Sequence, residues 1–159
     1  MWLHCETTRR HNPRMLEALA KISEEGGSLV GVDSASFEGD PSFITALVLR
    51  FESVTAVFRA VPDDDTLSVT LSPFVVETDE TLADAGSSPP WSTCLGLGVC
   101  WAWRLTNQQG YSDGVRLEFS VPGEESLATV ELVVSASAIY VFVIAPTAVT
   151  REGGAVARP

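Results

Sequence analysis

The chain has 159 residues, 45% hydrophobic and 19% charged, with a formal net charge of −11 at pH 7. This composition excludes a disordered chain and fits one domain that buries about two-thirds of its unfolded surface. Only one lysine, Lys21, stands among the ten basic residues. Nucleic-acid binding is disfavoured because phosphate contacts need clustered cations. A basic protein partner is electrostatically favoured.

We expect a single β-rich domain over residues 13–146, flanked by a flexible extension at 1–12 and a flexible tail at 147–159. The extension lacks the apolar core of a secretory signal. Residues 132–150 carry no charge and are long enough for a membrane helix, but their serines, proline and β-branched residues favour two strands instead. We therefore predict a cytoplasmic protein without a membrane span.

The first predicted element is an amphipathic helix over 13–25. Pro13 suits the first helical position, and Gly26 and Gly27 end the helix. The apolar residues predicted to share its buried face are Met15, Leu16, Leu19 and Ile22.

Strands are predicted next, at 29–36, 43–51, 54–61 and 66–71. The Asp63-Asp-Asp65 cluster between the last two is interpreted as a solvated turn, the alternative being a hard-cation site. The acidic connector at 77–84 is predicted to hold one helical turn.

A strand is also predicted at 95–105. Its even spacing of apolar residues would place Trp101 and Trp103 in the core and Cys94 and Cys100 on a compact opposite face. After a hairpin loop at 107–114, a half-buried strand at 115–121 and a final hairpin of strands at 127–134 and 139–145 follow.

These elements predict an α+β fold that is mainly antiparallel β. About eight strands joined by short turns form a twisted meander, either a partial barrel or two layers, with the amphipathic helix at its N-terminal end.

The candidate binding residues cluster around the 107–114 loop, where amide, phenol, carboxylate and guanidinium groups gather. They are Arg104, Asn107, Gln108, Tyr111, Asp113 and Arg116. Turn chemistry alone also accounts for the asparagine and the aspartate. No catalytic motif accompanies these residues, and we expect neither a metal site nor a cofactor.

One arrangement of motifs runs from Trp91 and Leu95-Gly96 through the tryptophan-rich strand to Asn107-Gln-Gln-Gly-Tyr-Ser-Asp113 and Arg-Leu-Glu-Phe119. In this arrangement the chain resembles a family of small bacterial proteins of unknown function, DUF6334-like, over about Leu16 to Ala145. The resemblance implies a bacterial cytoplasmic protein and brings no activity or catalytic residue.

Two functions follow as hypotheses. The favoured one is a non-enzymatic acidic binding module, immunity- or antitoxin-like, that engages a basic protein partner. The alternative is a small enzyme or ligand-binding protein whose site lies beside the 107–114 hairpin, with Tyr111, Asp113, Arg104 and Arg116 as its polar groups.

Overall fold

The computed structural model describes residues 13–144, so the expected extension at 1–12 and tail at 147–159 lie outside the described residues. Two helices occur in this part of the chain, α1 (Pro13–Glu25) and α2 (Trp91–Cys94). The first sheet contains β1 (Leu29–Phe37), β2 (Asp40–Phe51), β3 (Thr55–Val61), β4 (Thr66–Thr70) and β5 (Glu80–Asp84). The second contains β6 (Gly98–Leu105), β7 (Gly114–Ser120), β8 (Ala128–Ser135) and β9 (Ala138–Ile144).

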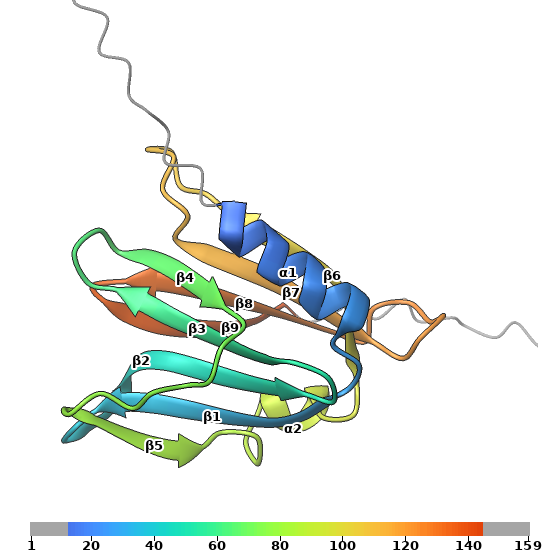
Figure 1. The fold of residues 1–159 in the computed structure, drawn as a ribbon, viewed down its shortest axis with the longest axis horizontal. Helices are drawn as coiled ribbons and strands as arrows, with labels where there is room; N and C mark the ends of the chain where they lie inside the picture. Colours follow the sequence, from blue (N-terminus) through green and yellow to red (C-terminus); the bar gives the residue numbers. More distant parts are fainter. Residues whose placement is uncertain (1–12, 145–159) are drawn as a thin grey trace, which may run out of the picture.

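The two sheets form layers that do not close into a barrel (Figure 1). Their strand orders are β4-β3-β2-β1-β5 and β6-β7-β8-β9, and every neighbouring pair is antiparallel. The predicted fold class is therefore confirmed, in its two-layer form. No helix among the described residues is long and apolar enough to cross a membrane.

Helix α1 lies where the prediction placed it, but its buried face differs by one residue. Met15, Ala18, Leu19 and Ile22 are buried, whereas Leu16 is 42% exposed. The buried set follows the i, i+3, i+4, i+7 spacing of one helix face, and Leu16 lies beside that face. The helix packs against β4 and β6, the edge strands of the two sheets.

Strand β5 is the main error in the predicted first half. Residues 80–84 do not form a helical turn but pair with β1, where Asp84 lies opposite Asp33 and Glu80 opposite Phe37. Because β5 is a short, exposed edge strand, its sequence lacks the alternating apolar pattern by which half-buried strands are recognised.

The core lies between the inner faces of the sheets and is completed by α1. Its largest fully buried side chains include Leu47, Leu49 and Phe58 from the first sheet, and Leu117, Phe119 and Leu132 from the second. Each contributes about 1.5 to 3 kcal/mol of burial free energy.

Hydrogen bonds also join the layers, one of them from the amide of Leu67 on β4 to the carbonyl of Ser112 in the 107–114 loop (2.9 Å). At one end, Leu29 donates its amide to the carbonyl of Leu97 (2.8 Å) and accepts from the amide of Gly96 (2.8 Å). At another, the carboxylate of Asp65 in the β3–β4 turn accepts from the amide of Ser137 in the β8–β9 turn (2.7 Å). The relative placement of the sheets is therefore fixed by polar contacts as well as by the core.

The segment before β6 differs from its prediction. Instead of starting a strand, Cys94 ends the short helix α2 and is fully buried. Burial raises the pKa of its thiol, opposed by a weaker hydrogen bond from Thr93. A buried thiol in its neutral form packs as a small apolar group and is unreactive.

Candidate functional site

A β-bulge in β6 reverses the predicted orientation of two tryptophans. Val99 pairs with Phe119 and Trp101 with Glu118, so the strand has one residue, Cys100, more than its partner at this point. An extra residue shifts the inward and outward alternation of every residue that follows. Ala102 therefore packs against the core, while Trp101 and Trp103 point outward and are 63% and 41% exposed. The prediction that these tryptophans are core residues is wrong.

The outer face of the second sheet is consequently aromatic at both edges. The register places Trp101 in one cross-strand row with Ile144, and Trp103 in the next with Phe142. On β9, Tyr140, Phe142 and Ile144 are all exposed. We call this surface the aromatic face, defined by Trp101, Trp103, Leu105, Arg116, Glu118, Thr129, Glu131, Val133, Tyr140, Phe142 and Ile144.

Charged side chains cross the middle of the aromatic face. Arg116 of β7 donates from Nε to the carboxylate of Glu131 on β8 (2.8 Å), so this guanidinium is already paired. Glu118, opposite Trp101, makes no ion pair with any described cation. The face therefore presents one carboxylate without a cationic partner, beside two stacked indoles whose ring centroids are 6.2 Å apart.

The predicted hairpin loop forms, and one residue organises it. The side-chain oxygen of Asn107 accepts from the amides of Gln109 (3.0 Å) and Tyr111 (3.2 Å). The amide of Asn107 donates to the carbonyl of Tyr111 (3.0 Å), and Gly110 takes a φ of 87°. Asn107 thus holds the turn, because its side-chain oxygen takes the place of a backbone carbonyl as the acceptor for two loop amides.

The remaining loop side chains have no comparable structural role. Gln108 and Tyr111 are exposed, while the backbone carbonyl of Asp113 accepts from Val134 (2.7 Å). Their side chains donate or accept none of the hydrogen bonds found among the described residues. They remain available for contacts, and their predicted binding role stays a prediction.

The two arginines of the predicted site do not converge. Arg104 pairs with the fully buried Val115, and Arg116 pairs with the outward-facing Trp103. Since cross-strand partners lie on the same face of a sheet, the two guanidiniums emerge from opposite faces.

The Asp63-Asp-Asp65 cluster holds a turn, as interpreted from the sequence. The carboxylate of Asp64 accepts from the amide (3.3 Å) and hydroxyl (2.6 Å) of Thr66. Asp65 takes a φ of 50° and bonds across to Ser137. No set of three metal-ligating side chains is arranged to hold an ion within the described residues.

A second surface lies on the outer face of the first sheet, where residues 71–79 link β4 to β5. This link, which we call the strap, passes in front of β3 and β2 (Figure 1). Residues 71–76 make no backbone–backbone hydrogen bond among the described residues, and Val75 is 73% exposed. Residues 71–76 of the strap are therefore held by side chains, whereas its last residue, Asp79, accepts from the backbone amide of Glu38 (2.8 Å).

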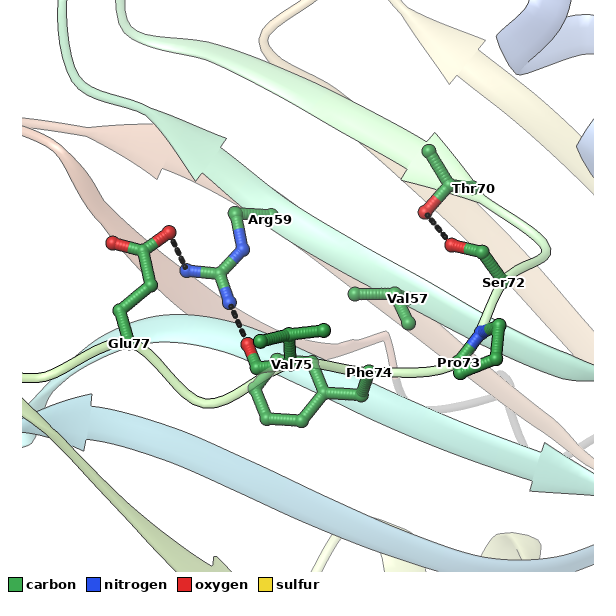
Figure 2. Close-up of a pocket in the computed structure, with 8 residues that line it drawn as sticks. All are labelled: Val57, Arg59, Thr70, Ser72, Pro73, Phe74, Val75 and Glu77. Carbon is green, nitrogen blue, oxygen red and sulfur yellow. Dashed lines mark hydrogen bonds and ion pairs between the residues drawn. The ribbon is translucent and has the colours of Figure 1, made fainter.

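Arg59 of β3 provides that attachment (Figure 2). Its guanidinium donates to the carbonyl of Val75 (3.2 Å), pairs with Glu77 (3.2 Å) and Glu80 (2.7 Å), and lies 5.3 Å from the centroid of Phe74. The side chain of Glu80 is only 4% exposed. Its burial acts to raise its pKa, but hydrogen bonds from Arg59, Thr45 and the amide of Glu77 outweigh burial and leave the pKa below the usual range.

Phe74 lines two grooves. The smaller, about 240 Å³, contains the Arg59 attachment shown in Figure 2. The larger, about 680 Å³, extends from Lys21 of α1 past Arg50 of β2 to Leu82 of β5.

The aromatic face and the larger groove were both missed by sequence reasoning. The sequence of β9 did contain an indication of the aromatic face. Ala138–Ile144 is apolar at odd and even positions, and only one face of the strand can pack against the core, so the apolar residues of its other face are left outward. The groove has no local signal, because its residues come from α1, four strands and the strap.

The fold and surfaces define a small two-layer antiparallel β protein with an exposed aromatic sheet face. Residues 17–148 match the model of a family described as "Family of unknown function (DUF6334)", and the chain belongs to this family. No curated protein matched the chain, and no solved structure did.

Proposed function

We propose that the protein is a non-enzymatic binding module whose aromatic face engages a basic protein partner. The observation that carries the proposal is the pair of stacked, exposed indoles, Trp101 and Trp103, beside the carboxylate of Glu118, which pairs with no cation in the described part of the chain. Exposed apolar surface bordered by polar groups marks interaction sites on proteins. Tryptophan is also among the residues that dominate interface energetics.

The chemistry beside Glu118 suits an arginine or lysine side chain from the partner. An indole face attracts a cation through its quadrupole, by about 0.5 to 2 kcal/mol. A guanidinium can stack on such a ring while it donates to a carboxylate, which favours arginine over lysine. Trp101 and Glu118 are directly opposite across neighbouring strands, so one side chain of the partner can contact both.

The charge of the whole chain supports the same class of partner. A net charge of −11 steers basic proteins toward the molecule and repels acidic ones. An immunity- or antitoxin-like role is the most specific form of this proposal, and its support is the charge and the small size. The proposal includes the cytoplasm as the location, with an odd cysteine count as its support.

Titration of the protein with tetra-arginine amide, followed by tryptophan fluorescence at low salt, tests the proposal. We expect a saturable change with tetra-arginine and none with tetra-glutamate. Glu118→Gln should weaken binding about fivefold, equivalent to about 1 kcal/mol. Trp101→Leu should weaken it at least as much.

The matched control is Glu124→Gln, which removes one charge from the exposed β7–β8 loop. Equal weakening by Glu118→Gln and Glu124→Gln would mean that only net charge is sensed, and the aromatic face would lose its proposed role. Equal affinity of the parent and the Trp101→Leu variant for tetra-arginine would likewise contradict a role for the aromatic face.

A further inference from the structure

The larger groove beside the strap has an apolar lining built from separate parts of the chain. Val48 comes from β2, Leu82 from β5, and Leu71, Pro73, Phe74 and Val76 come from the strap. Its volume of about 680 Å³ lies in the range of sites that hold small organic molecules. An apolar ligand body placed here would cover Leu82 and Val76, which are 43% and 44% exposed, whereas Val48 is already buried.

Arg50 lines this groove, and two neighbours orient its side chain. Its guanidinium pairs with the carboxylate of Asp33 on the neighbouring strand. It also lies over Gly31, where an added Cβ would be only 2.6 Å from Nη2. Glycine at 31 therefore leaves the space that this guanidinium occupies. The ion pair with Asp33 and the space left by Gly31 together determine the orientation of the Arg50 side chain.

Part of this oriented guanidinium remains available. Both Nη atoms of Arg50 donate to the carboxylate of Asp33, whereas Nε makes no hydrogen bond among the described residues and the side chain is 44% exposed. Five N–H donors in a planar fork exceed what one carboxylate can take, and a second carboxylate can bind to the remaining edge.

The surroundings of the groove are less acidic than the chain as a whole. Two cations, Lys21 and Arg50, and one carboxylate, Asp33, line the groove, whereas the whole chain has a net charge of −11. Two other carboxylates lie near these cations. Asp84, close to Arg50, accepts from the amide of Gly86 (3.1 Å), and Glu25 lies 3.8 Å from Lys21 on the exposed helix surface.

We propose that this groove binds a small carboxylate with an apolar body, its anionic end on Arg50 and its apolar part against Leu82 and the strap. This site lies on the first sheet and is independent of the proposed function of the aromatic face. Arg50 is the ligand-contacting cation, and Asp33 and Gly31 position it.

Titration of the ¹⁵N-labelled full chain with sodium decanoate, followed by amide NMR shifts, tests this site. We expect saturable shifts at Arg50, Ser53, Thr55 and Leu82, with a Kd of about 1 mM or tighter, as is typical for a ligand of this size. Decylammonium, with the same apolar chain and the opposite charge, should bind at least about tenfold more weakly. Equal binding of the two probes would overturn the assignment of a carboxylate ligand.

Arg50→Gln should weaken decanoate binding about tenfold, whereas Arg14→Gln, at the exposed start of α1, should leave it unchanged. Should Arg50→Gln fail to fold, Gly31→Ala provides a second test, because its Cβ displaces the end of a flexible side chain and leaves every charge in place. Unchanged decanoate binding in Gly31→Ala or in a folded Arg50→Gln variant would contradict the proposal. If the parent shows no amide shift at a decanoate concentration about tenfold above the expected Kd, the proposed site is overturned outright.

Discussion

Trp101 and Trp103 stack on each other on the outer face of the second sheet, with ring centroids 6.2 Å apart and ring planes at 29°. Both indoles remain substantially exposed, so water rather than protein covers much of their surface in the isolated chain. A partner that covers them removes apolar surface from water at about 25 cal/mol per Å². The stacked pair is thus a preformed surface for association.

Substituting these tryptophans should cost little stability. We expect Trp101→Ala and Trp103→Ala to lower the free energy of unfolding by about 1 kcal/mol or less, as is usual for exposed positions. Trp91, only 3% exposed, is the matched comparison, and Trp91→Ala should cost about 3 to 5 kcal/mol. Urea unfolding of the three variants checks this. A loss of several kcal/mol in Trp101→Ala would place that indole in the core.

The strap should depend on Arg59. Arg59→Met leaves the nearly buried carboxylate of Glu80 without its cation, and we expect a loss of roughly 3 kcal/mol, the lower end of the range for a buried charge without its partner. Amides of residues 71–76 should also exchange faster with solvent. Thermal unfolding and hydrogen exchange measure the two effects. Arg14→Met is the control, and an equal stability loss there would show that Arg59 has no special role.

The ionised carboxylate of Glu80 in the same attachment makes the stability of the protein depend on pH, with a loss of stability in acid. The folded state holds the pKa of Glu80 below its usual range, so its contribution is complete above about pH 4.3, the ordinary glutamate value. It is lost as the pH falls through the lower folded-state pKa. The stability difference between the parent and Glu80→Gln should therefore be largest near neutral pH and shrink in acid. A difference that grows as the pH falls would contradict this assignment.

In the 107–114 loop, structural and exposed residues should separate on substitution. Asn107→Ala removes the acceptor of two backbone amides and should cost about 1 kcal/mol. Tyr111→Ala and Asp113→Ala should each stay within about 0.5 kcal/mol of the parent. Thermal midpoints of the three variants check the ranking. A large loss in both Tyr111→Ala and Asp113→Ala would assign these side chains to the fold and remove them as contact residues.

The sequence predicts those parts of the fold that local patterns determine. Helix α1 follows from Pro13, the apolar spacing and Gly26, and the 107–114 turn follows from Asn107 and its glycines. The outward rotation of Trp101 could not be predicted in this way, since it depends on a register shift at Cys100 that only the pairing with β7 reveals. β5 was missed for a related reason, because its strand conformation comes from pairing with β1.

The candidate sites were less predictable than the fold. Arg104 and Arg116 look close in sequence, but the register of β6 and β7 sends them to opposite faces. Arg50 and Leu82 are 32 positions apart in the chain and line one groove, because the strap leads from one edge of the first sheet to the other. Surfaces assembled from distant segments have no local sequence pattern.

Site-specific photo-crosslinking in the native host tests the central claim most directly. A benzoylphenylalanine at Phe142 would lie on the aromatic face, and one at Val75 would lie on the strap of the other sheet. Although Val75 is the more exposed of the two, at 73% against 51%, we expect a crosslink to a basic protein from position 142 and none from position 75. Crosslinks to a basic protein from position 75 alone, or only to acidic proteins or to a second copy of the chain from position 142, would contradict the account.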